Sequence, residues 1–183
     1  MRGPEAIEYE IAAVDPHAHL FEVTLTIARP DPAGQELALP AWIPGSYLVR
    51  EFARNIVRIE ASSDGKPLAL TKLDKHSWRL APCEGPASVR YRVYAWDLSV
   101  RGAHLDATHG FFNGTSVFLR VLGQEHEACA VRIAAPAGEF GRDWRVATTL
   151  PADGAPRWGF GRYRAADYDE LIDHPVEMGR FTT

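Results

Sequence analysis

Two segments of this chain alternate strictly between two kinds of side chain, and this alternation constrains the fold more than any other feature. In residues 19–28 (HLFEVTLTIA) and 88–96 (SVRYRVYAW), every second side chain is apolar, and those between are mostly polar or long and amphipathic. A period of two places alternate side chains on opposite faces of a strand. The sequence therefore predicts two β-strands, each with one buried face and one wet or half-covered face.

Eight further segments have weaker β character, which brings the predicted strands to ten. The chain has 15 glycines and 13 prolines among its 183 residues, and they fall between the segments. Asp64-Gly65 fits a two-residue hairpin, Pro44-Gly45 a type II turn and Asn113-Gly114 a type I′ turn. This pattern predicts an all-β fold, an antiparallel β-sandwich. The eight segments are residues 7–14, 35–39, 55–61, 67–71, 77–81, 116–122, 128–134 and 161–165.

One short helix is predicted near the end of the chain. Asp167 can cap residues 168–172, and Pro175 stops the helix. Strands do not alternate with long amphipathic helices, which disfavours a doubly wound α/β enzyme. No internal repeat or linker is visible, so we predict a single β-sandwich domain over residues 1–183.

Composition excludes several classes of protein. The 20 Lys and Arg against 24 Asp and Glu give a net charge of −4, without the basic clusters that nucleic acids require. No window is apolar enough to span a membrane, and the first residues lack the apolar core of a signal peptide. We expect a cytoplasmic protein with free thiols at Cys83 and Cys129, and neither a nucleic-acid nor a membrane partner.

The histidines are the first candidates for metal or acid–base chemistry. His126-Glu127 begins like the zinc-protease motif H-E-x-x-H, but residue 130 is alanine. His104, Asp106 and His109 form the best metal-like cluster, since two imidazoles and a carboxylate can hold zinc or iron. Turn-forming or cleft-edge roles explain these three residues more simply, and we predict no metal site in this chain.

Other catalytic signatures are missing from the sequence. Ser46 lacks the first glycine of G-x-S-x-G, and Gly159-Phe160-Gly161 lacks the rest of a phosphate-binding loop. We therefore predict no catalytic residue. The five tryptophans leave open a ligand-binding sheet surface, although core and sheet-surface roles are commoner for this residue.

Five blocks resemble, in order, the N-terminal domain of the glycyl aminopeptidase family of zinc metallopeptidases, whose members can carry a PDZ domain. They are LPAWIPGSYLVREFARNI (39–56), LDKHSW (73–78), YRVYAWDLSVRGAHLD (91–106), HGFFNGTSVFL (109–119) and ADYDELIDHPVEMGRF (166–181). The resemblance implies a β-sandwich followed by a catalytic domain. That domain would hold zinc through H-E-x-x-H, which no stretch of this chain matches, so we expect no cofactor in the chain itself.

The resemblance also implies partners and site residues. The partners would be the catalytic domain of the same polypeptide and, in the intact enzyme, a peptide substrate. By analogy with larger aminopeptidases, one loop would line the substrate cleft: His109, Phe112, Asn113, Gly114 and Thr115. Residues 42–47 and 167–175 would contact the catalytic domain, with Trp42, Pro44, Tyr47, Tyr168 and Leu171 as candidates.

Two other functions compete with this interpretation. The chain can be a stand-alone β-sandwich module that binds peptide or carbohydrate through exposed aromatic side chains. It can also be a small metalloenzyme built on His104, Asp106 and His109. The sequence favours the non-catalytic peptidase domain, which supplies a cleft wall and interdomain contacts and hydrolyses nothing alone.

Overall fold

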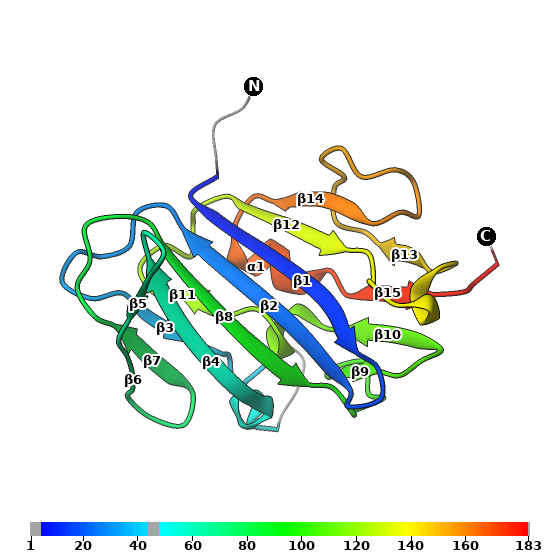
Figure 1. Ribbon diagram of the computed structural model, residues 1–183, viewed down its shortest axis with the longest axis horizontal. Helices are drawn as coiled ribbons and strands as arrows, with labels where there is room; N and C mark the ends of the chain where they lie inside the picture. The colour runs from blue at the N-terminus through cyan, green and yellow to red at the C-terminus, as the bar shows by residue number, and fades with distance from the viewer. Residues whose placement is uncertain (1–4, 44–47, 183) are drawn as a thin grey trace.

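The computed structural model describes residues 5–43 and 48–182, and in them nearly all regular structure is β-strand. Figure 1 shows a large sheet with two smaller sheets packed against one of its faces. Within the described residues, no helix is long and apolar enough to cross a membrane. The large sheet has the order β14-β12-β1-β2-β8-β4-β5, and the smaller sheets have the orders β13-β15-β10-β9 and β11-β3-β7-β6.

The strands of the large sheet are β1 (Ile7–Asp15), β2 (Leu20–Ile27), β4 (Ile56–Ser63), β5 (Lys66–Leu68), β8 (Ala87–Tyr94), β12 (Cys129–Ala134) and β14 (Gly161–Ala165). The smaller sheets contain β3 (Glu36–Ala38), β6 (Leu70–Lys72), β7 (Ser77–Leu80), β9 (Ala103–Leu105), β10 (His109–Phe112), β11 (Arg120–Val121), β13 (Arg145–Thr148) and β15 (Val176–Gly179). The helices are the 3-10 turns η1 (Phe52–Asn55), η2 (Gly114–Ser116) and η3 (Glu139–Gly141), and α1 (Tyr168–Asp173).

The two strictly alternating segments form β2 and β8, as predicted. Every second residue of each strand is buried, and the residues between are partly or fully exposed. The two strands pair in antiparallel register, so their apolar faces coincide and form the centre of the core. The sandwich and its short helix are therefore confirmed.

One strand pair departs from the antiparallel prediction. β1 and β12 run parallel, with Ile7 opposite Cys129 and Ala12 opposite Ala134. A parallel pair requires a crossover connection rather than a hairpin. Here β2 to β11 lie in the chain between β1 and β12, and this parallel pair makes the large sheet mixed.

The local predictions had mixed outcomes. Asp64 and Gly65 have φ of 48° and 74° and close the β4–β5 hairpin, as predicted. Pro44-Gly45 lies outside the described residues. Asn113-Gly114 does not form a type I′ turn, because Asn113 is extended (φ −89°) and precedes the 3-10 turn η2. Asp167 caps α1 as expected, since its side chain accepts a hydrogen bond from the Glu170 N–H at 2.8 Å.

Candidate functional site

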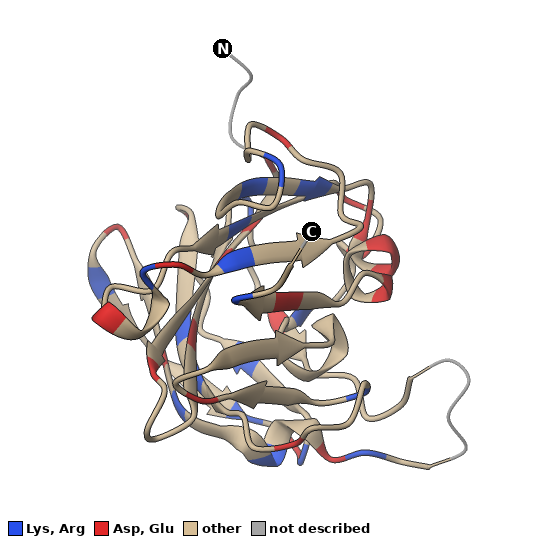
Figure 2. Cartoon of the chain, turned by 90° about the vertical axis from the view of Figure 1, so that its right-hand side faces the viewer, with Lys and Arg blue, Asp and Glu red and all other residues tan. Residues whose placement is uncertain are grey.

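The predicted cleft loop begins in β10, a central strand of the β13-β15-β10-β9 sheet. Phe112 pairs with Val176 and Ala103, and this row faces the core. Phe111 pairs with Glu177 and His104, so it lies on the opposite, outer face. Figure 2 views the side of the molecule where these strands lie, and they carry few charged residues.

This register changes which aromatic residue can reach a cleft. Phe112 is fully buried and packs edge-on against Phe21 and Phe118, with ring centroids 5.7 and 5.6 Å apart. Phe111 is partly exposed, as is His109 two residues before it. Sequence reasoning chose Phe112 and missed Phe111. Alternation along a strand would place Phe111 and Phe112 on opposite faces, but HGFFNG was not predicted to be a strand.

Asn113, Gly114 and Thr115 have structural roles: the Asn113 side chain caps η2, and the other two residues are buried. The Asn113 side-chain oxygen accepts hydrogen bonds from the N–H (3.1 Å) and hydroxyl (2.5 Å) of Thr115, which caps η2. A Cβ on Gly114 would lie 2.9 Å from the Ile172 Cα and 3.2 Å from the Leu171 carbonyl oxygen. Glycine at this position therefore permits the close packing of η2 against α1.

Between η2 and β11, residues 117–119 are buried but do not form a strand. Residues 116–122 were predicted as one strand, but only Arg120–Val121 pair with a neighbour, β3. Three buried tyrosine hydroxyls supply the missing hydrogen bonds by donating to consecutive carbonyl oxygens. Tyr91 donates to Val117 (2.6 Å), Tyr168 to Phe118 (2.7 Å) and Tyr9 to Leu119 (2.7 Å).

Burial raises the pKa of Tyr9, Tyr91 and Tyr168 well above the ordinary value, because the phenolate would lose its hydration. Unfolded tyrosine ionises near pH 10. Below that pH both states are neutral and the stabilisation is complete. Above it only the unfolded chain loses protons, so the stability of the fold falls as pH rises.

In an alkaline titration followed by tyrosinate absorbance, we expect these three of the six tyrosines to ionise only as the chain unfolds. Ionisation of Tyr9, Tyr91 and Tyr168 while the circular dichroism spectrum still shows a folded chain would contradict this expectation.

The residues expected to contact a catalytic domain differ in accessibility. Tyr168 and Leu171 are buried, so the inner face of α1 is occupied within this domain. Trp42 is 55% exposed and available, whereas Pro44 and Tyr47 lie outside the described residues.

A second set of exposed apolar side chains was not predicted. Leu48 and Val49 are 65% and 75% exposed, and Leu98 and Val100 are both 74% exposed. A hollow of about 460 Å³, lined by residues 48–52, Arg54, Asn55 and Asp97, connects the two loops that carry these residues. We call these four residues the apolar loop patch.

The structure brings together the metal-like cluster of the sequence. The His104 Nε2 lies 3.1 Å from Asp106 Oδ2, and the His109 Nδ1 lies 3.6 Å from Asp106 Oδ1. Burial of Asp106 raises its pKa, but hydrogen bonds from Thr108, His104 and the His109 N–H outweigh this and hold the pKa well below its usual range. Asp106 is therefore an ionised carboxylate.

The remaining candidates for chemistry stay separate from this region. His126 is exposed and, among the described residues, pairs with the neighbouring Glu127 at 3.6 Å. Cys83 and Cys129 are free, as expected, and burial raises the pKa of the Cys129 thiol to about 12. Cys129 therefore lacks the lowered pKa of a reactive thiol.

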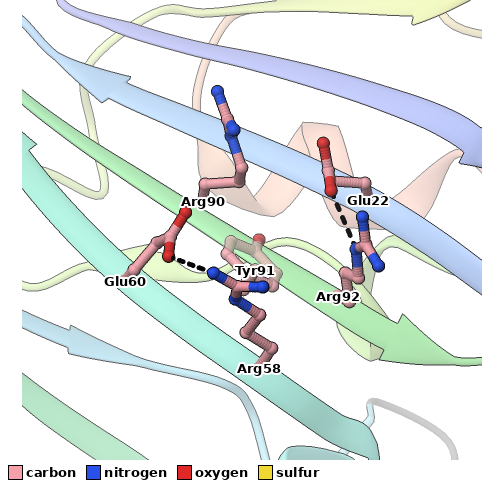
Figure 3. Close-up of a pocket in the computed structure, with 6 residues that line it drawn as sticks. All are labelled: Glu22, Arg58, Glu60, Arg90, Tyr91 and Arg92. Carbon is pink, nitrogen blue, oxygen red and sulfur yellow. Dashed lines mark hydrogen bonds and ion pairs between the residues drawn. The ribbon is translucent and has the colours of Figure 1, made fainter.

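The outer face of the large sheet is a mosaic of charges (Figure 3). Arg58 pairs with Glu60 and Arg92 with Glu22, each at 2.9 Å, while the buried Tyr91 lies between them. The hollow between these side chains encloses about 80 Å³. Small-molecule pockets typically enclose about 300 Å³ or more, so this hollow is not a ligand pocket.

Two solved structures share the fold of this chain. The crystal structure of an aminopeptidase N family protein from Idiomarina loihiensis is 45% identical, with a TM-score of 0.93 over 96% of this chain. An M1 zinc metallopeptidase from Deinococcus radiodurans, in a mutant form bound to a Tyr-Ser-Ala peptide, has the same fold at 11% identity, with a TM-score of 0.52 over 94% of this chain. The present chain covers 30% of the first protein and 41% of the second.

Residues 8–180 match the Peptidase M61 N-terminal domain, and the chain belongs to this family. It is thus an N-terminal domain of the M61 peptidase type, and it is similar to part of an aminopeptidase N family protein. A search of curated proteins found no match.

Proposed function

We propose that this domain is the non-catalytic part of a glycyl aminopeptidase-like zinc metallopeptidase and forms one wall of its substrate cleft. Zinc would be bound by the catalytic domain, where it polarises the scissile carbonyl. The chain itself carries no H-E-x-x-H. Its own contribution would be to position the substrate and to hold the catalytic domain.

The observation that carries this proposal is the outer face of the β13-β15-β10-β9 sheet. Phe111 is partly exposed on a central strand of that face, opposite the exposed carboxylate of Glu177. Asn113 follows in the same alternation and is fixed by its bonds to Thr115. An aromatic ring and a carboxylate on a rigid sheet can bind a peptide with little loss of conformational entropy.

The apolar loop patch is our candidate for contact with the catalytic domain. Its four apolar side chains are each at least 65% exposed, and exposed apolar surface can mark an interaction site. Trp42, which is also exposed, is a further candidate.

The cleft proposal is tested by replacing Phe111 with alanine in the full-length protein. We expect kcat/KM for a glycyl amide substrate to fall at least tenfold, because an aromatic contact to the substrate is lost. The matched control is Tyr94→Ala, which removes a 41% exposed ring from the outer face of the large sheet. Equal kinetics for Phe111→Ala and the control, with both variants folded, would exclude Phe111 from the cleft.

A stand-alone binding module remains the second candidate function. The exposed Trp96 (55%) and Tyr94 near the end of β8 favour it. The charge mosaic beside them opposes it, since carbohydrate and peptide platforms present largely apolar surface.

A further inference from the structure

We propose that His104, Asp106 and His109 form a binding site for a divalent transition metal, with Zn²⁺ as the reference ion. All three ligand residues belong to this chain. The site would connect β9 to β10 rather than carry out hydrolysis.

The spacing of the donor atoms carries the proposal. The ligand atoms of the three residues all lie within 4.8 Å of one another. Tetrahedral zinc with bonds of about 2.0–2.1 Å places its ligand atoms about 3.3 Å apart. The separation of 3.1 Å between His104 Nε2 and Asp106 Oδ2 already fits, and His109 Nδ1 lies 3.6 Å from the other oxygen of the same carboxylate, Oδ1. Closure requires the His109 ring, 32% exposed, to turn toward Oδ2 and its Nδ1 to leave the Thr108 hydroxyl, 3.2 Å away.

The cluster is also held in place before any metal arrives. Asp106 Oδ1 accepts hydrogen bonds from the N–H groups of Thr108 (2.7 Å) and His109 (3.0 Å) and from the Thr108 hydroxyl (2.6 Å). These bonds leave Oδ2 directed at His104 as the free ligand atom. A preorganised ligand set loses little conformational entropy on binding.

His104 is the buried member of the cluster. Its side chain is only 3% exposed, yet its Nδ1 has no hydrogen-bond partner in the described part of the chain. Buried polar atoms are normally paired. Because Nδ1 is unpaired in either neutral tautomer, a metal that takes Nε2 and moves the ring proton to Nδ1 creates no additional orphan atom.

The donor set selects the class of ion. Two imidazoles and one carboxylate favour zinc and neighbouring transition metals over Ca²⁺ and Mg²⁺, which prefer oxygen ligands. The partial exposure of Asp106 and His109 leaves room for water as a fourth ligand.

Trp96 provides a local probe, since its ring stacks on His104 with centroids 4.8 Å apart. The experiment titrates the metal-free 183-residue chain with Zn²⁺ by calorimetry and with Co²⁺ by visible absorption and tryptophan fluorescence. We expect one equivalent of Zn²⁺, a tetrahedral Co²⁺ spectrum and quenching that disappears in Trp96→Phe. In His109→Ala, affinity should fall at least tenfold.

The control variant is His126→Ala, which removes an exposed histidine (77%) remote from β9 and β10 in the pairing scheme. It should bind Zn²⁺ as tightly as the parent chain. The absence of stoichiometric binding by the folded parent would overturn the proposal, as would equal affinity in His109→Ala. Because no substrate is involved, these results are independent of the cleft proposal.

Discussion

Replacing Tyr91 with phenylalanine is expected to lower the free energy of unfolding by about 2–6 kcal/mol. The hydroxyl donates to the Val117 carbonyl oxygen at 2.6 Å and accepts from the Leu119 N–H at 3.1 Å, and both groups are buried. Each buried polar group left unpaired costs about 1–3 kcal/mol. The measurement is urea denaturation followed by circular dichroism.

The matched control for this prediction is Tyr94→Phe, which removes a hydroxyl from a ring that is 41% exposed on the same strand. Its stability should change by no more than about 0.5 kcal/mol. If the two variants were equally stable, the tyrosine hydroxyls would not support the 117–119 segment.

The second large effect is expected for Gly114→Ala. The new methyl group would meet the backbone of Leu171 and Ile172, and backbone cannot move aside as a side chain can. Overpacking of this kind costs about 1–3 kcal/mol. That cost exceeds the gain of about 0.4–1 kcal/mol from a less flexible unfolded chain. We expect lower stability and faster amide exchange in α1.

Gly123→Ala is the comparison for this variant. A Cβ at Gly123 meets no atom within 4 Å, but its φ of +83° should cost about 1 kcal/mol through backbone strain alone. Exchange in α1 should then stay unchanged. If Gly114→Ala left exchange in α1 unchanged as well, the close approach of η2 and α1 would not be a packing constraint.

The large sheet could be predicted from the sequence, and the sheet beside the candidate cleft could not. None of β9, β10, β13 and β15 was predicted, although β3 and β7, which are equally short, were. β10 contains Gly110, which lowers β propensity. Glycine occurs there because a Cβ would lie 2.9 Å from Met178 and 3.2 Å from Phe21, a tertiary constraint that local sequence does not reveal.

The same limitation explains the error at residues 116–122. Val117, Phe118 and Leu119 are consecutive apolar residues, which is the pattern of a buried strand. The hydrogen bonds that replace strand pairing come from Tyr9, Tyr91 and Tyr168, distant in sequence. No local pattern could show that these three hydroxyls converge.

The sequence could indicate the candidate loop but not which of its side chains face outward. Recognition of HGFFNG depended on the family resemblance, whereas the choice between Phe111 and Phe112 depended on strand register. His104, Asp106 and His109 could be identified as a cluster because they share one short segment. Their burial and the unpaired Nδ1 required the structure.

We propose that this domain assists hydrolysis without performing it. The most direct test compares glycyl amide hydrolysis by the 183-residue chain, supplied with excess Zn²⁺, with hydrolysis by the full-length polypeptide. We predict turnover by the full-length protein only, and no turnover by the chain even when it binds Zn²⁺. Zinc-dependent turnover by the isolated chain, abolished in His109→Ala, would contradict the account and make this domain an enzyme in its own right.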